Sequence, residues 1–112
     1  MELEKIVNDT QNLSNRLHAP EALGPWDPCT LVADLAGETG TLAQSILTLE
    51  GIAAAPPESA HLTRDMPRLL YMLVNLGNFY RIDLEQAWNN MIHEGWANLE
   101  KMENNEGADT KN

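Results

Sequence analysis

Three acidic residues near the middle of the chain have the chemistry and spacing to hold a divalent cation. Asp34 and Glu38 are four residues apart, so within a helix their carboxylates share one face. Asp65 lies on a later segment and could approach them from a second helix. Magnesium prefers oxygen ligands and usually keeps several of its waters. Carboxylates on two neighbouring helices could therefore share such an ion, and the four-residue spacing would let Asp34 join Glu38 as a replacement ligand.

Apolar residues at helical spacing predict four helices joined by short loops. The first covers about residues 2–18. The second has Asp27 as its N-cap, Pro28 in its first turn and Gly51 at its end. The fourth begins after Asp83, which suits an N-cap with a glutamine three residues later, as in a capping box.

The third helix ends near Tyr80, and the sequence leaves its start open. Proline has no backbone N–H and clashes with the preceding turn inside a helix. Either the helix begins near Met66 with Asp65 as its N-cap, or it begins near Glu58 and bends at Pro67.

These elements predict an all-α fold, a four-helix bundle over residues 1–103 followed by a disordered polar tail over 104–112. Residues 69–76 are apolar almost all round the third helix, which implies contacts on several sides. We therefore expect self-association through the central helices, as a dimer or a tetramer.

Composition narrows the expected partners and location. The net charge is −10, and such an acidic chain repels the phosphate backbone, so we expect no nucleic-acid binding. The first residues lack the basic and apolar regions of a signal peptide, and the apolar stretch 69–80 is too short to span a bilayer. The single cysteine, Cys29, cannot form an internal disulfide and is expected to be a small buried residue. We expect a cytoplasmic protein without membrane contact.

Two segments resemble motifs of the MazG-like, all-α nucleoside triphosphate pyrophosphohydrolases. That family has a helix reading roughly Pro-x-Asn-Leu, six residues, and Glu-x-Gly-Glu-Leu-Ala-Glu; this chain has a comparable helix over 28–44, with Glu-Thr-Gly-Thr-Leu-Ala-Gln at 38–44. A later family motif, Ile-Asp-Leu-x-x-Ala, matches residues 82–87. The resemblance covers about residues 22–96. It implies a dimer or pair of dimers and magnesium-dependent hydrolysis of a nucleoside triphosphate to the monophosphate and pyrophosphate.

The resemblance also implies four acidic metal ligands, of which this chain keeps Glu38 and Asp65. Thr41 replaces the third acid with a neutral hydroxyl, and Arg68 replaces the fourth with a permanent positive charge. A guanidinium pairs well with a carboxylate, so Arg68 facing Glu38 would neutralise that acid without metal. In that interpretation Asp65 caps a helix, and Asp34 is solvated or salt-bridged.

Further positions of the family concern the nucleotide. The resemblance places Met91 and Gly95 where a Lys and an Asn usually contact the phosphates. Trp26 precedes the second helix, where an aromatic residue often lies near the base, and His18 lies near a segment that can line the base pocket. Trp26 and His18 are therefore candidate nucleotide-binding residues; core or interface packing for Trp26, and a surface position for His18, are the alternatives.

Three hypotheses follow. In the first, the chain is a MazG-like protein that has lost hydrolysis and acts as a nucleotide-binding or structural oligomer. In the second, it is an active magnesium-dependent hydrolase of nucleoside triphosphates, with Asp34 and Glu38 holding one metal. In the third, it is a non-catalytic helical interaction module, whose net charge of −10 favours a basic partner.

Overall fold

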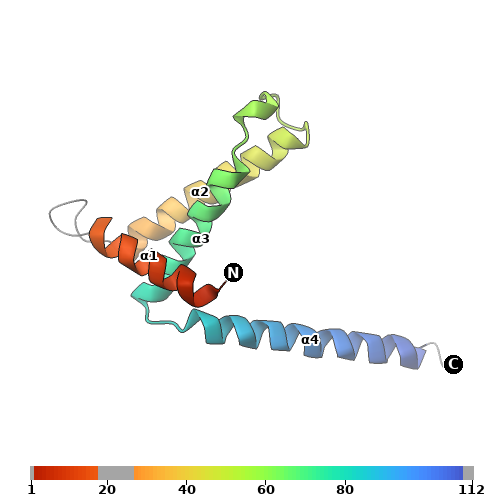
Figure 1. Ribbon diagram of the computed structural model, residues 1–112. Coiled ribbons are helices and arrows are strands. Elements are labelled where there is room, and N and C mark those ends of the chain that lie inside the picture. Colours follow the sequence, from red (N-terminus) through yellow and green to blue (C-terminus); the bar gives the residue numbers. More distant parts are fainter. Residues whose placement is uncertain (1, 18–26, 110–112) are drawn as a thin grey trace. The chain divides into compact units, whose positions relative to one another are not determined.

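Helices make up the regular structure of the part of the chain that the structure describes. A computed structural model describes residues 2–17 and 27–109. In order, these contain α1 (Leu3–Leu17), α2 (Pro28–Leu49), the short 3₁₀ turn η1 (Pro57–Ser59), α3 (Leu62–Phe79) and α4 (Leu84–Asp109) (Figure 1). The all-α class expected from the sequence is confirmed for this part of the chain, which has no strand.

The chain divides into two compact units. The first, residues 1–81, holds α1, α2, η1 and α3, and the second, residues 82–112, holds α4. The expected domain end at residue 103 falls inside α4, which continues to Asp109.

Both ends of α2 follow the signals in the sequence. The Asp27 side chain accepts a hydrogen bond from the backbone N–H of Cys29 at 2.9 Å, as an N-cap does. At the other end Gly51 has φ 75°, and the N–H of Ile52 donates to the carbonyl of Leu47 at 2.9 Å. This is a Schellman ending, which needs a left-handed residue and so favours glycine. Cys29 is exposed in the first turn, so the expectation that it is buried is wrong.

The third helix begins earlier than a cap at Asp65 would allow. α3 starts at Leu62, and the N–H of Asp65 already donates to the carbonyl of His61 at 2.9 Å. The hypothesis that Asp65 is the N-cap is therefore wrong, because Asp65 lies in the first turn of the helix. Pro67 lies inside α3, where the turn before it lacks one backbone hydrogen bond.

The junction between α3 and α4 has its own local geometry. Arg81 has φ 56°, a left-handed conformation that non-glycine residues seldom adopt. Asp83 then accepts a hydrogen bond from the N–H of Gln86 at 3.0 Å, so its expected role as an N-cap is confirmed. The Gln86 side chain donates to Asn90 at 2.9 Å, and its oxygen accepts no hydrogen bond from the Asp83 N–H. The cap is therefore made by Asp83 without the return hydrogen bond of a capping box.

In the first unit, α2 and α1 each pack against α3 (Figure 1). Among the large apolar side chains of the described residues, only Leu31 and Val74 are fully buried. Polar and charged residues buried with them are Thr10, Ser14, Ser45, Thr48, Asp65 and Asn75. The interior is therefore small, and polar contacts contribute much of its specificity.

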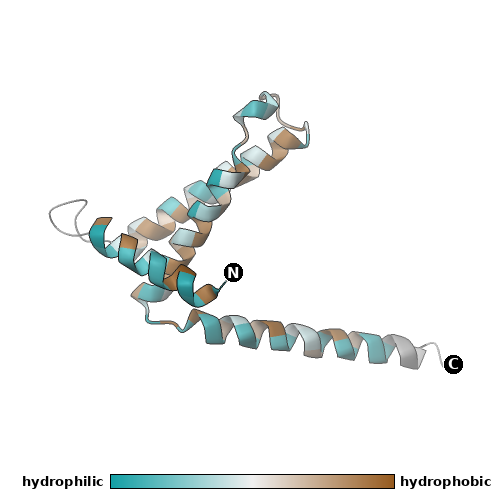
Figure 2. Ribbon diagram, viewed as in Figure 1, coloured by the Kyte–Doolittle hydropathy of each residue, from teal (hydrophilic) through white to brown (hydrophobic). Residues whose placement is uncertain are grey.

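Many large apolar side chains remain exposed, and apolar residues recur along α1, α2, α3 and α4 (Figure 2). On α2 and α3 they include Val32, Ile46, Leu49, Leu70 and Leu73. On α4 they recur at helical spacing, at Trp88, Met91, Ile92, Trp96, Leu99 and Met102. None of the described helices combines the length and apolar character needed to cross a membrane.

Candidate functional site

An ion pair joins α2 and α3 at the position where the sequence suggested a metal. The Nη1 atom of Arg68 lies 3.5 Å from Oε1 of Glu38. Glu38 is mostly buried, with 18% of its side chain exposed, whereas the Arg68 side chain is 55% exposed. The second oxygen, Oε2, is buried without a hydrogen-bond partner. The expected Arg68–Glu38 pair is confirmed.

The two other α2 positions, Thr41 and Asp34, have different surroundings from Glu38. The Thr41 hydroxyl donates to the backbone carbonyl of Gly37 at 3.2 Å, so its proton is used within its own helix. Asp34, one turn before Glu38, is exposed to solvent. This exposure fits a solvated carboxylate at Asp34.

Asp65 is enclosed and has different partners. None of its side chain is exposed, and its Oδ2 accepts a hydrogen bond from the Ser45 hydroxyl on α2 at 2.7 Å. Its Oδ1 has no hydrogen bond and lies 3.6 Å from Nε of Arg64. Ser45 also accepts from the backbone N–H of His61 at 3.4 Å. The Ser45 hydroxyl thus links the start of α3 to α2. Because Asp65 takes part in this contact, its side chain points inward and does not cap the helix.

These contacts do not fit a magnesium site. A magnesium ion needs several oxygens around one point in near-octahedral geometry. Here a guanidinium faces Glu38, and Asp65 is held by Ser45. Within residues 2–17 and 27–109, no group of three or more His, Cys, Asp and Glu side chains is placed to hold a metal ion. The three candidate ligands are therefore not gathered into one site.

The other candidates are two nucleotide-binding residues and two positions on α4. His18 and Trp26 are outside the described residues. Met91 and Gly95 are exposed on α4, in the second unit. The site that can be described thus consists of the Glu38–Arg68 pair and its surroundings, an open hollow whose other walls are Pro67, Tyr71 and Met72.

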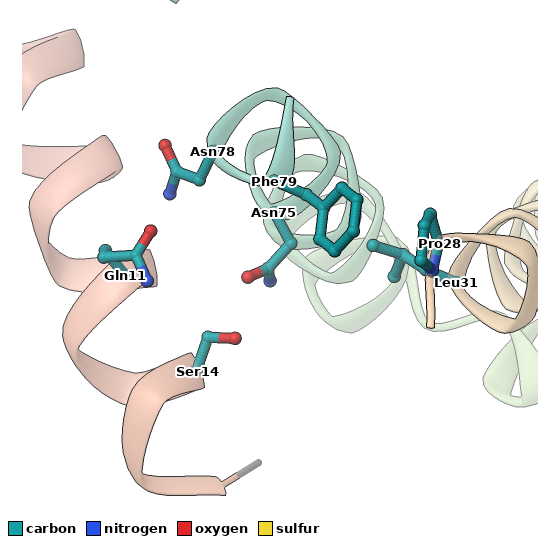
Figure 3. Close-up of a pocket in the computed structure, with 7 residues that line it drawn as sticks. All are labelled: Gln11, Ser14, Pro28, Leu31, Asn75, Asn78 and Phe79. Carbon is teal, nitrogen blue, oxygen red and sulfur yellow. The ribbon is translucent and has the colours of Figure 1, made fainter. Parts of the chain in front are cut away.

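A separate cavity in the first unit was not anticipated from the sequence. It has a volume of about 130 Å³ and is lined by Gln11 and Ser14 of α1, Pro28 and Leu31 of α2, and Asn75, Asn78 and Phe79 of α3 (Figure 3). A signal for it existed, because Asn75 and Asn78 interrupt the apolar second half of α3 and a buried amide must find partners.

No protein-family model matches this chain, and neither a curated protein nor a solved structure was found to match it. The MazG-like resemblance therefore stays a hypothesis supported by the residues of the motifs themselves.

Proposed function

We propose that this chain is a MazG-like protein that does not hydrolyse nucleoside triphosphates and acts as a helical oligomer. The observation that supports this proposal is the Arg68–Glu38 ion pair. A cation-dependent hydrolase needs negative charge where this chain has a positively charged guanidinium.

The charge balance explains why the pair disfavours a metal. A divalent ion near Glu38 would experience repulsion from Arg68, and it would have to compete with Arg68 for the Glu38 carboxylate. Because Glu38 is mostly buried, the guanidinium already compensates part of the cost of keeping that carboxylate charged. Arg68 thus takes the place of the cation.

The distribution of apolar residues supports the oligomer. A chain with two fully buried large apolar side chains in its described part gains little stability from its own interior. Apolar surface left on α2, α3 and α4 suits contact with further helices. We propose that the four helices complete a MazG-like bundle in a dimer or tetramer.

The catalytic side of the proposal is tested by measuring pyrophosphate release from a panel of nucleoside triphosphates with magnesium. We expect no release above the rate without protein. Robust release that disappears in Glu38→Gln would instead establish the active hydrolase.

A restoring variant tests the metal site directly. Thr41→Glu combined with Arg68→Asp would put two new acids close to Glu38, so calorimetry should detect magnesium binding that the parent chain lacks. The matched control combines Thr39→Glu with Arg68→Asp, because residue 39 lies one position from Glu38 and on a different helix face. Equal magnesium binding by both double variants would contradict the assigned geometry.

One feature supports a nucleotide as a ligand without metal. Arg64 and Arg68 are one turn apart on α3, and their side chains are 50% and 55% exposed. Each guanidinium has five N–H donors, so both keep donors that a phosphate could use. Binding of nucleotides that is unchanged by a chelator and lost in Arg64→Ala with Arg68→Ala would support this second candidate, and binding that requires magnesium would exclude it.

A further inference from the structure

The cavity between α1 and α3 has the dimensions of a small ring. Its volume is about 130 Å³. An engineered protein cavity of about 150 Å³ accepts benzene, so this space holds one six-membered ring and little more. Of a whole nucleotide, only one ring would fit inside it.

The walls of the cavity are apolar on one side and polar on the other. Phe79, Pro28 and Leu31 supply apolar surface on one side. In Figure 3 the polar side chains of α1, Gln11 and Ser14, face the asparagines of α3. Among the described residues no charged side chain lines the cavity, so a charged ligand would lose its hydration without gaining an opposite charge from them.

The polar side chains that line the cavity offer both hydrogen-bond donors and hydrogen-bond acceptors to a ligand. Nδ2 of Asn78 is a buried donor with no hydrogen-bond partner. Asn75 uses its Nδ2 on the Tyr71 carbonyl at 3.0 Å, which leaves its side-chain oxygen as an acceptor. Gln11 uses its Nε2 on Asn15 at 2.6 Å, which likewise leaves an acceptor. Rotation of an amide by half a turn only exchanges donor and acceptor, so the cavity keeps both kinds of group.

We propose that this cavity is a binding site for a small uncharged ring that carries a carbonyl next to an N–H, as cyclic amides and free nucleobases of the uracil type do. The ring carbonyl accepts from the unpaired Asn78 amide, and the ring N–H donates to the side-chain oxygen of Asn75 or Gln11. The apolar wall, with Phe79, contacts the face of the ring. A buried donor that lacks a partner costs free energy, and this ligand removes that cost.

The cavity is distinct from the Glu38–Arg68 pair. Asn75 follows Arg68 by about two helical turns on α3, roughly 10 Å along its axis. A ligand confined to a single ring therefore does not reach the ion pair. Ring binding and the loss of hydrolysis can each fail without affecting the other.

The test is a titration of the full chain, ¹⁵N-labelled, followed by the side-chain amide signals in NMR spectra. The probes are δ-valerolactam and uracil, and the comparison ligand is cyclohexanone, which has the ring size and the carbonyl but no N–H. We expect saturable shifts of the Asn78 amide signals with the two amide rings, and at least tenfold weaker binding of cyclohexanone. Equal binding of all three ligands, or no binding of either amide ring, would overturn the proposal and leave a cavity that holds water or any small molecule.

Two variants locate the binding at this cavity. Asn78→Leu keeps the approximate side-chain size and removes the unpaired donor, so it should weaken binding of both amide rings at least tenfold while the backbone spectrum stays folded. Asn12→Leu, on the same helix as Gln11 but outside the lining, is the matched control and should bind as the parent does. If Asn78→Leu fails to fold, Ser14→Val tests the same point from α1, because it removes a hydroxyl and narrows the cavity. Binding that is unchanged in every folded variant of the lining would refute the site.

Discussion

The Ser45 hydroxyl on α2 donates a 2.7 Å hydrogen bond to the fully buried carboxylate of Asp65 on α3. The same oxygen accepts from the backbone N–H of His61, the residue just before α3. A buried carboxylate is stable only when other groups compensate its charge. Ser45 therefore fixes both the start of α3 and the direction of Asp65.

Ser45→Ala should destabilise the fold by about 1.5–3 kcal/mol, because it leaves Asp65 with no hydrogen-bond donor to its side chain. Chemical denaturation followed by circular dichroism measures the change. Ser59→Ala is the control, since Ser59 is exposed and makes only a local hydrogen bond to Pro56. Equal losses in the two variants would mean that the Ser45–Asp65 contact contributes no special stability.

Arg68→Ala should lower stability by about 1 kcal/mol, since a half-exposed ion pair is weak but Glu38 is left mostly buried without a cation. In a domain of this size the melting temperature should fall by roughly 4–8 °C. Added magnesium should recover part of the loss in this variant and not in the parent chain.

Arg16→Ala provides the comparison, because Arg16 is exposed on α1. The assignment of Arg68 as a substitute cation would be abandoned if both variants melted like the parent with and without magnesium.

Gly51→Ala and Gly40→Ala should change stability in opposite directions. Gly51 has φ 75°, where a Cβ is strained, so Gly51→Ala should cost about 1 kcal/mol. Gly40 lies within α2, and a Cβ there meets nothing within 4 Å, so alanine should stabilise the helix by up to about 1 kcal/mol. Thermal melts at two protein concentrations measure both, and destabilisation by Gly40→Ala would show that a partner subunit packs against that face.

The chain should self-associate, and light scattering at high micromolar concentration should give a mass above that of the monomer. Leu73, which is 53% exposed on α3, is a good position to disturb the contact. Leu73→Glu should shift the chain towards monomer, whereas Thr63→Glu, at an exposed polar position on α3, should not. A parent chain that stays monomeric would remove the oligomer from the proposed function.

Local signals in the sequence predicted the helices well. Asp27, Asp83 and Gly51 each act within a few residues along the chain, and each occupies the predicted role. The start of α3 was predicted less well because it depends on Ser45, sixteen residues earlier, and no local pattern shows that contact.

The candidate site was likewise predicted only in part. The Glu38–Arg68 pair could be predicted because it combines opposite charges at positions that a family resemblance aligned. The inward direction of Asp65 and the amide cavity could not, since both depend on which faces of α1, α2 and α3 meet. Asn75 and Asn78 are polar residues in the apolar second half of α3, and that mismatch was the signal that the sequence offered.

Arg68 also determines how many mutations separate this chain from one that binds a cation. Arg68→Asp alone would remove the repelling guanidinium and add a second acid close to Glu38, so it should already bind magnesium weakly. Thr41→Glu alone would add an acid while the guanidinium still repels the metal. Because only the change at position 68 improves metal binding by itself, selection that proceeds one substitution at a time would have to start there. A directed-evolution library for metal binding should therefore change Arg68 first and vary position 41 in that background.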